Sequence, residues 1–221
     1  MNIVFVLFPG VTQLDFTGPA QVLSRLPNAT TVVAARETVP IMTDSGFAIM
    51  PSHGFAQAPP ADILCVPGGH GVSEALACPD TIAFVRDQAA GAKWVTSVCT
   101  GAFILGVAGL LKGKRATTHW AYHHLLSLVG AEPVEARVVQ DGQTITAGGV
   151  TSGIDFALTL VAREAGEAWA RGLQLSLEYD PAPPFNAGHP SRADGATVQH
   201  MRDRIYTAAA ARMAIAIEAT R

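Results

Sequence analysis

The chain has 221 residues, of which 49% are hydrophobic and 15% are charged, so it can bury a large core and is not disordered. A net charge of −3 and a pI near 6.1 exclude the basic surface that nucleic acids or anionic membranes select. We find no secretory leader and no apolar run of the roughly 18 residues that a membrane span needs. Three cysteines without metal-ligand spacing fit a reducing cytoplasm. We therefore expect one cytoplasmic domain over residues 1–221, with no nucleic-acid or membrane partner.

The first half of the chain alternates short apolar runs with helical patterns, which is typical of a mainly parallel sheet covered on both faces. In chain order, the expected elements are a strand at 2–8, a helix at 13–26, a strand at 29–35, a small hairpin of 41–43 with 48–51, a strand at 62–66 and a helix at 79–90. The pattern predicts an α/β fold with a mainly parallel sheet sandwiched by helices, as in flavodoxin-like proteins.

The second half continues the same alternation and ends in helices. The expected elements are a strand at 93–98, a helix at 100–111, a short strand at 115–118, a helix at 121–129, strands at 134–139 and 143–147, and helices at 152–163, 167–177 and 196–217. Asp141-Gly142 is a strong turn signal that pairs the last two strands. The Pro- and Gly-rich stretch 179–195 is predicted to be an ordered surface arm.

A cysteine follows the strand at 93–98 and directly precedes a helix. Val98 ends the strand, and Gly101 relieves crowding in the turn after Cys99. A helix N-terminus favours the thiolate form of cysteine through its free N–H groups and positive dipole end. A buried structural cysteine fits the same sequence, because cysteine is commonly a small core residue. The arrangement is similar to a nucleophile elbow, and Cys99 is the candidate nucleophile.

Asp15 follows the first strand on a stretch that otherwise consists of inward-facing apolar residues. Ligands of parallel sheets bind beyond the carboxyl ends of the strands, so this aspartate is placed where chemistry is expected. A carboxylate among apolar neighbours would have a raised pKa and could donate a proton. A helix-capping aspartate is an equally good interpretation of this motif alone.

Gly68-Gly69 follows the strand at 62–66, and glycines there let backbone N–H groups approach a ligand closely. The N–H groups of Gly69 and Thr100 would then be two donors beside the sulfur of Cys99. An ordinary strand-to-helix turn is the alternative interpretation.

Two further segments could contribute to the site. His119 could serve Cys99 as a base or could be a structural polar residue, and we favour the structural role. Segment 148–152 also follows a strand and precedes a helix, and most of its role is expected to be close packing of helix on sheet. No metal-binding cluster, GxGxxG or Walker A sequence is present, so neither a metal nor a nucleotide cofactor is expected.

Four segments resemble the PfpI superfamily, whose members share the class I glutamine-amidotransferase-like fold. They are residues 8–15, 66–69, 97–102 and 115–120. Within that superfamily the chain most resembles isocyanide (isonitrile) hydratases, and the match extends over nearly its whole length. An aspartate, Asp15, stands opposite the cysteine, and Thr100 follows the cysteine where the protease-like branch carries a histidine. The arm at 177–188 is also similar to the hydratase C-terminal segment.

The resemblance implies a role for each matching residue. Cys99 would be the nucleophile and Asp15 the general acid and base. Gly69 and Thr100 would be the backbone donors, and Thr100 would also be a catalytic residue. Val150 would contact substrate, and Thr151 would lie with His119 in a supporting layer. True glutaminases need a downstream His-x-Glu pair, which is missing here.

The implied reaction adds water to an isocyanide to give an N-substituted formamide, through a covalent thioimidate on Cys99. Water is the only cosubstrate, no cofactor is needed, and a homodimer is expected. Amidase-like sensing domains of AraC-type regulators share two of the motifs almost equally well, and a glyoxalase- or chaperone-like stress protein is a third interpretation. Cys99 is predicted to be the only reactive thiol, with Cys65 buried and Cys78 the second candidate.

Overall fold

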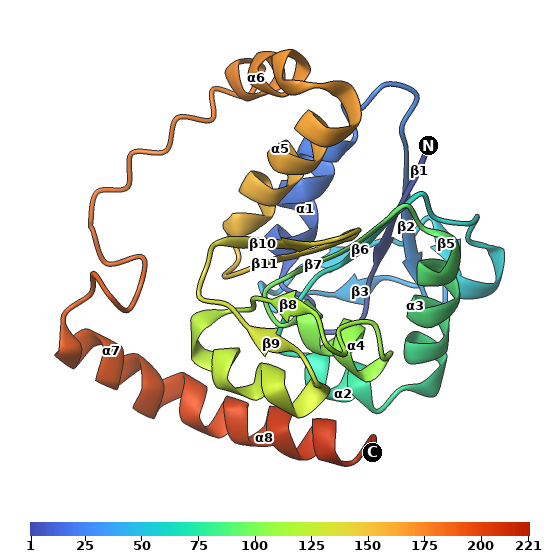
Figure 1. Cartoon of the computed structure of the whole chain (residues 1–221). Coiled ribbons are helices and arrows are strands. Elements are labelled where there is room, and N and C mark those ends of the chain that lie inside the picture. The colour runs from blue at the N-terminus through green and yellow to red at the C-terminus, as the bar shows by residue number, and fades with distance from the viewer.

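A seven-stranded sheet in the order β10-β11-β7-β6-β1-β2-β5 forms the centre of the computed structural model, which describes all 221 residues (Figure 1). Its strands are β1 (Asn2–Val6), β2 (Thr30–Ala35), β5 (His53–Gly54), β6 (Ile63–Val66), β7 (Trp94–Val98), β10 (Val138–Asp141) and β11 (Thr144–Ala147). Every neighbouring pair is parallel except β10 with β11. The predicted mainly parallel sheet is confirmed.

Helices cover both faces of this sheet (Figure 1). One face carries α1 (Gln13–Leu23), α5 (Ser152–Ala165) and α6 (Glu167–Ser176). The other carries α2 (Val72–Leu76), α3 (Pro79–Gly91), α4 (Gly101–Val107) and the 3₁₀ helix η2 (Trp120–Val129). Strands β6 and β7 are buried along their whole length, as expected for central strands of a parallel sheet between two helical layers, although β7 includes the polar residues Thr96 and Ser97.

Two minor sheets and a short 3₁₀ turn complete the main body. They are β3 (Ile41–Met42) with β4 (Ala48–Ile49), β8 (Arg115–Ala116) with β9 (Glu132–Pro133), and η1 (Phe55–Gln57). The antiparallel β3–β4 pair confirms the predicted hairpin. Strand β5 and helix α2 were not predicted, because elements of two and five residues are too short to show a periodic pattern.

One expectation from the sequence is wrong in detail. The strand expected at 134–139 is confined to Val138–Asp141, because the Val134 N–H donates to the carbonyl of Ala116 and draws the chain toward β8. The helix expected at 121–129 is present, as the 3₁₀ helix η2. Its buried residues are Tyr122, Leu125 and Leu126.

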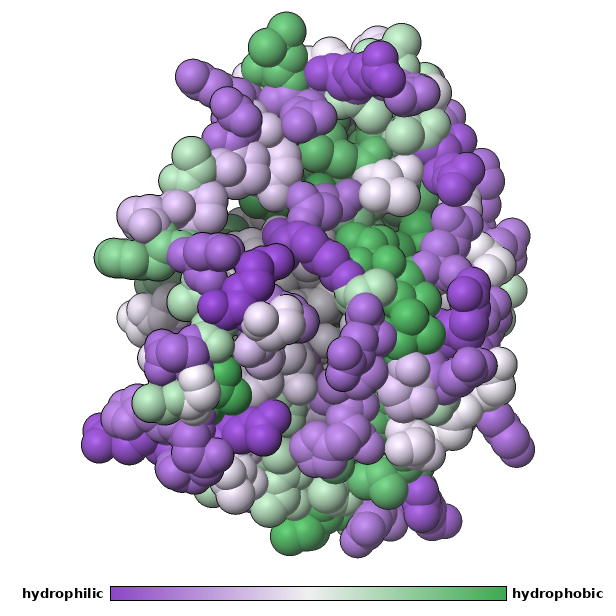
Figure 2. Space-filling model, turned by 60° about the vertical axis from the view of Figure 1, so that its left-hand side comes forward, coloured by the Kyte–Doolittle hydropathy of each residue, from purple (hydrophilic) through white to green (hydrophobic).

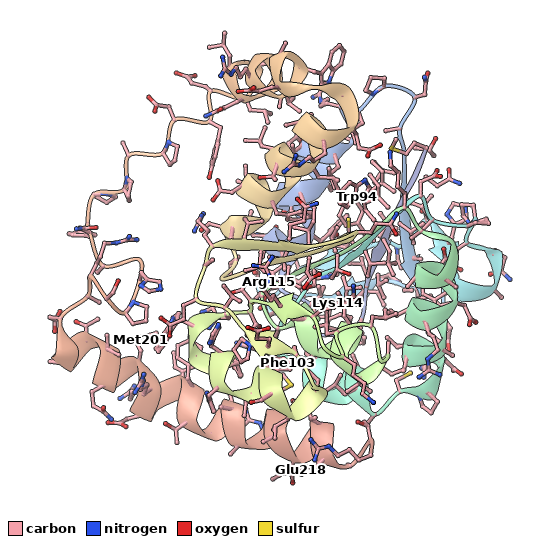
Figure 3. All side chains as sticks on the ribbon, in the orientation of Figure 1. Trp94, Phe103, Lys114, Arg115, Met201 and Glu218 are labelled. Atoms are coloured by element: carbon pink, nitrogen blue, oxygen red, sulfur yellow. The ribbon has the colours of Figure 1, made fainter.

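The C-terminal part leaves the body and returns to it. Residues 178–194 form an extended, almost wholly exposed arm that swings away from the sheet (Figure 1). The helix expected at 196–217 has the right extent, but a π-helical turn divides it into α7 (Gly195–Met201), η3 (Arg202–Tyr206) and α8 (Thr207–Glu218). Met201 and Glu218, labelled in Figure 3, mark the ends of α7 and α8.

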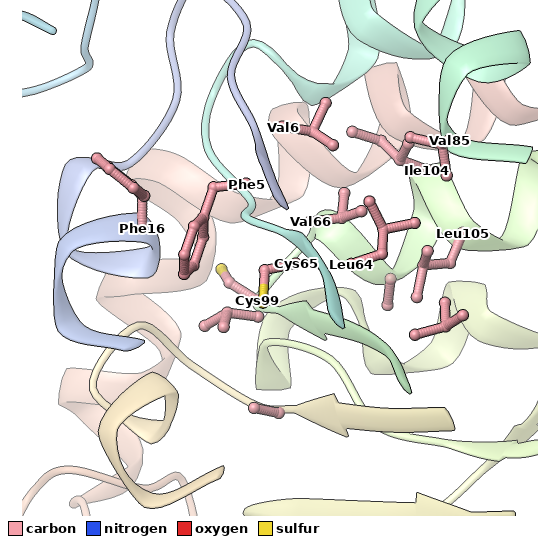
Figure 4. Close-up of a cluster of buried hydrophobic side chains, with 14 of the residues drawn as sticks. Phe5, Val6, Phe16, Leu64, Cys65, Val66, Val85, Cys99, Ile104 and Leu105 are labelled. Atoms are coloured by element: carbon pink, nitrogen blue, oxygen red, sulfur yellow. The ribbon is translucent and has the colours of Figure 1, made fainter. Parts of the chain in front are cut away.

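A single cluster of 52 buried apolar residues extends from Ile3 in β1 to Ile217 in α8. Figure 4 shows part of this core, with Cys65 and Cys99 among apolar side chains that include Phe5 and Phe16. The outer surface on the side of the arm is mainly hydrophilic, with apolar patches between the polar residues (Figure 2). None of the helices has both the length and the apolar character to cross a bilayer.

Candidate active site

The site lies where the strand order of the sheet reverses. From β1 the chain continues to β2 on one side, and it later returns to β6 and β7 on the other side. Crevices for ligands form at such switch points, beyond the carboxyl ends of the strands. The segments that follow β1, β6 and β7 carry Asp15, Gly68 and Cys99, so the three residues lie together at the carboxyl ends of these strands.

Cys99 has the strained backbone of a nucleophile elbow. Its φ of 56° lies in the left-handed region, which residues with a side chain rarely adopt. The Cys99 N–H donates to the carbonyls of Ala147 at 3.0 Å and Gly148 at 2.8 Å, and its own carbonyl accepts a 2.7 Å bond from the hydroxyl of Thr118. The predicted strand-to-helix elbow is therefore present, and these bonds hold its unusual conformation.

Asp15 is a buried carboxyl group with one oxygen unengaged. Only 1% of the residue is exposed; Oδ2 accepts a 2.9 Å bond from the Gly68 N–H, and Oδ1 has no partner in the protein. Burial raises the pKa of Asp15 to about 7, although the Gly68 N–H and the Cys99 thiol act to lower it. Because neither oxygen caps α1, the capping interpretation is wrong and the acid–base interpretation is favoured.

The charges of Asp15 and Cys99 are coupled. Burial and the Asp15 carboxylate raise the pKa of the Cys99 thiol, while the N–H and hydroxyl of Thr100 act to lower it. The expectation that the helix N-terminus lowers the pKa of Cys99 is therefore not met in the free protein, because burial and Asp15 outweigh the N–H of Thr100. Thiolate forms most readily when the thiol proton passes to Asp15, because the pair then still carries only one negative charge.

Thr100 and the two glycines are arranged differently from the prediction. The Gly69 N–H donates to Oγ1 of Thr100 at 3.0 Å, so it does not serve as a free donor beside the sulfur. The N–H of Thr100 does interact with the thiol, as expected. Gly68 is the residue whose role the sequence did not specify, because it supplies the N–H that holds Asp15.

The segment after β11 supports the elbow from the opposite side. Gly148 accepts the Cys99 N–H, and the partly buried Val150 packs against the core. Thr151 is exposed, and its hydroxyl accepts a 3.2 Å bond from Arg137. A Cβ on Gly148 would meet only ordinary contacts, whereas one on Gly149 would lie 3.2 Å from Cδ2 of His119, so close packing in this segment is found at Gly149.

His119 is neutral and lies in an aromatic environment. Burial lowers its pKa to about 4, and its Nδ1 accepts the Ala121 N–H at 3.3 Å. Its ring packs beside the rings of Tyr122 and Tyr206, with centroids 5.9 and 5.0 Å apart. A ring of such low basicity is a poor general base near pH 7, which favours the structural role. Sequence reasoning did not place either tyrosine beside His119. Tyr206 is remote from His119 in the chain, so no local pattern could have indicated the contact.

The other two cysteines differ from Cys99 in their environments. Cys65 is buried, and burial raises its pKa to about 12. Burial acts to raise the pKa of Cys78 too, but hydrogen bonds from Thr81 and the Asp80 N–H lower it overall. The pKa of Cys78 is therefore lowered in the free protein while that of Cys99 is raised, and the prediction that Cys99 is the only reactive thiol stays a prediction. No group of three or more His, Cys, Asp or Glu side chains is placed to hold a metal.

Comparisons with known proteins identify the family of the chain. The model of the DJ-1/PfpI family matches residues 1–163. The isonitrile hydratase of Pseudomonas putida is 50% identical over 92% of this chain and 90% of its own length. The crystal structure of a ThiJ/PfpI family protein from Pseudomonas syringae superposes with a TM-score of 0.95, at 39% identity over 98% of this chain and 90% of that one. The regulator GbdR of Pseudomonas aeruginosa is 28% identical over 63% of this chain, a region that is 38% of the regulator.

Proposed function

Since this chain belongs to the DJ-1/PfpI family, we propose that it is an isocyanide hydratase, which adds water to an isocyanide to give an N-substituted formamide. The observation that carries the proposal is the buried Asp15–Cys99 pair at the carboxyl ends of β1 and β7. One member supplies a sulfur nucleophile, and the other is a carboxyl group with a pKa of about 7 that can both give and take a proton. The 50% identity to an isonitrile hydratase supports the same reaction.

The first step forms a carbon–sulfur bond and a carbon–hydrogen bond. The thiol proton of Cys99 passes to Asp15, and the resulting thiolate attacks the terminal carbon of R–N≡C. Asp15 then returns that proton to the same carbon, which gives a neutral thioimidate, R–N=CH–S–Cys99. The N–H of Thr100 stabilises the thiolate while it carries the charge.

The second step consumes water. Asp15, now a carboxylate, accepts a proton from a water molecule whose oxygen adds to the thioimidate carbon. That proton moves on to the substrate nitrogen, and the tetrahedral carbon expels the sulfur of Cys99 as the formyl C=O forms. The remaining water proton restores the singly protonated Cys99–Asp15 pair. The balance is R–NC plus H₂O to R–NH–CHO, with no cofactor.

The assay that tests this function follows formation of N-phenylformamide from phenyl isocyanide. We expect turnover by the wild-type chain and none by Cys99→Ala, with both proteins folded by circular dichroism. Absence of turnover in both proteins would instead favour a sensing role like that of the AraC-type regulators. The similarity to the regulator GbdR covers 63% of this chain, whereas the similarity to the isonitrile hydratase covers 92%, so the sensing role is the second candidate. Lactate formation from methylglyoxal without isocyanide turnover would favour the stress-protein alternative.

We also propose that residues 1–221 act as one unit, that two copies form a homodimer and that the enzyme works in a reducing cytoplasm. Three large apolar side chains on α6 and the arm support the dimer, because exposed apolar groups of this size mark interfaces. They are Trp169, Leu175 and Phe185, which are 49%, 81% and 79% exposed. Three free cysteines support the reducing compartment. Sedimentation of a monomer at micromolar concentration would contradict the dimer.

A further inference from the structure

Four polar side chains meet at the start of α5. Oδ1 of Asp155, in the first turn of this helix, accepts a 2.6 Å hydrogen bond from the hydroxyl of Tyr179, at the root of the arm. Oδ2 of Asp155 pairs with Nε of Arg137, the residue before β10. Nη2 of Arg137 also donates to Oγ1 of Thr151, the residue before α5, at 3.2 Å. We call these four residues the Asp155 cluster.

The Asp155 cluster fixes the direction of the arginine. Both carboxylate oxygens of Asp155 have a partner, and its side chain is only 28% exposed. Burial, followed by the bond to Asp155, raises the pKa of Tyr179, so its hydroxyl keeps its proton and donates. The guanidinium group is planar and rigid, and two of its nitrogens are engaged, so Arg137 is held in one orientation.

Arg137 holds both ends of the segment that follows β11. Its backbone carbonyl accepts the N–H of Gly148 at 2.9 Å, and its side chain bonds to Thr151 three residues later. Gly149 comes directly after Gly148, and glycine has more backbone freedom than any other residue. Segment 148–151 therefore needs bonds to the rest of the protein to keep one conformation, and Arg137 supplies them at each end.

Segment 148–151 in turn holds the elbow. The carbonyl of Gly148 accepts the N–H of Cys99 at 2.8 Å, the shorter of the two bonds that this N–H makes. Cys99 has a φ of 56°, and such a strained conformation persists only where the surrounding structure fixes it. A continuous series of hydrogen bonds thus extends from Asp155 through Arg137 and Gly148 to Cys99. No side chain of the Asp155 cluster bonds to the sulfur, so the effect of the cluster on Cys99 passes through Gly148.

The β10–β11 ladder is the other structure that could fix Gly148, because Val138 pairs with Ala147 directly before it. That pair is the end of the ladder, however, and β10 is the edge strand of the sheet (Figure 1). The ends of secondary-structure elements open more easily than their centres. The side chain of Arg137 extends the order past the end of the ladder to the start of α5.

We propose that Arg137 is a positioning residue for Cys99, and that Asp155 and Tyr179 hold Arg137 in place for this role. The inference rests on the proposed hydratase function, in which the sulfur of Cys99 must meet the carbon of the isocyanide. A change at Arg137 alters how the nucleophile is aimed, and it removes no contact with the catalytic carboxyl group. It should therefore lower kcat and leave KM nearly unchanged.

The test compares Arg137→Gln with Arg115→Gln, since each removes one guanidinium group from the surface. Arg115 of β8, labelled in Figure 3, is the matched control: it is 55% exposed against 53% for Arg137, and it pairs with Asp141. With phenyl isocyanide, kcat of Arg137→Gln should fall about tenfold, less than the roughly 10²-fold cost of a 1 Å misplacement, because the ladder still holds part of the segment. KM should stay within about twofold, and Arg115→Gln should change neither value by more than about twofold.

A double variant tests whether the members of the cluster act together. Asp155→Asn keeps the shape of the side chain and removes the charge that pairs with Arg137. It should lower kcat in the same direction as Arg137→Gln. The variant that carries both changes should be no worse than Arg137→Gln alone, because both residues act on one contact. Losses of kcat that multiply in the double variant would contradict a shared role.

Amide hydrogen exchange, followed by NMR on the free protein, is a measurement that does not depend on turnover. The amides of Gly148 and Cys99 should exchange about tenfold faster in Arg137→Gln, because their bonds open locally more often. The amide of Val95 in β7, which bonds to the carbonyl of Gln143, should exchange at the wild-type rate. Arg115→Gln should change none of the three rates.

Three results would each overturn the inference. They are an unchanged kcat in Arg137→Gln, unchanged exchange at Gly148 and Cys99, and an equal acceleration at Val95, which would indicate a general loss of stability. The failure of the proposed function gives a different result. If the wild type hydrates no isocyanide, that function fails, and hydrogen exchange still tests the role of Arg137. If the wild type is active and Arg137→Gln behaves like Arg115→Gln in both measurements, only the inference fails.

Discussion

The backbone N–H of Gly68 donates a 2.9 Å hydrogen bond to Oδ2 of Asp15, and the missing side chain of that glycine is what lets the carboxyl group sit there. A Cβ on Gly68 would lie 2.9 Å from Oδ2 and only 2.6 Å from both the backbone nitrogen and Oγ1 of Thr100. One glycine thus fixes the distance between the acid and the residue after the nucleophile.

Gly68→Ala should consequently damage catalysis more than folding. The added methyl group must displace Asp15 or Thr100, and misplacement of reacting groups by about 1 Å can cost on the order of 10²-fold in rate. We expect kcat/KM to fall by about that factor, measured by formamide formation. Gly91→Ala in α3 is the matched control, because a Cβ there has nothing within 4 Å. Equal activity of the two variants would show that the close approach at Gly68 is unimportant.

Asp15→Asn removes the titrating group and keeps the shape of the side chain. Turnover should fall by about 10²–10⁴-fold, the usual effect of losing a general acid. Combining it with Cys99→Ala should be no worse than Cys99→Ala alone, because residues that serve one covalent step are strongly non-additive. Near-normal turnover of Asp15→Asn would mean that the proton reaches the substrate carbon from another group.

The pH profile follows from the raised pKa of Asp15. Below about pH 7 Asp15 and Cys99 are both protonated, and no carboxylate is available to accept the thiol proton. Above that value the pair holds one proton and is reactive, and it stays so until the high pKa of Cys99 is reached. We expect kcat/KM to rise about tenfold per pH unit up to a plateau near pH 7–8, with no loss before the alkaline range. Activity that is highest at pH 5 would contradict this assignment.

The sequence alone predicted the elements that long apolar patterns define. The strands ending before Gly68 and Cys99 and the helix containing Asp15 were found, since continuous apolar runs next to glycine have few other interpretations. Short elements such as β5 depend on tertiary packing and were missed, whereas the helix at 121–129 was found without its 3₁₀ geometry being specified. The family resemblance was confirmed by the match over residues 1–163.

The electrostatics of the site could not be predicted from local sequence. A cysteine before a helix suggests a lowered pKa, but burial and the approach of Asp15 reverse the direction. Asp15 and Cys99 are more than eighty residues apart in the chain, and no periodic pattern in the sequence indicates that they meet. The contact of the Tyr206 and His119 rings has the same origin, because the two residues are remote in the chain.

Alkylation by iodoacetamide tests these pKa directions without substrate. Cys78 should react before Cys99 at neutral pH, since its pKa is lowered and that of Cys99 is raised. Asp15→Asn should move the alkylation of Cys99 to lower pH even though turnover falls, because the variant lacks the carboxylate charge that raises the thiol pKa. Peptide mass spectrometry at several pH values measures both effects, and alkylation of Cys78 is the internal control. An unchanged pH dependence at Cys99 would mean that the two groups are not coupled.

The most direct test of the account is to trap the sulfur–carbon bond on Cys99. Wild-type protein is mixed with phenyl isocyanide, quenched in acid within milliseconds and mapped by peptide mass spectrometry. We predict a transient adduct on the Cys99 peptide, equal in mass to one intact phenyl isocyanide, which decays as N-phenylformamide forms and is absent from Cys99→Ala. In H₂¹⁸O the label should enter the formyl oxygen. Formamide production by Cys99→Ala, or an adduct on any other residue that forms and decays at the catalytic rate, would contradict the covalent mechanism.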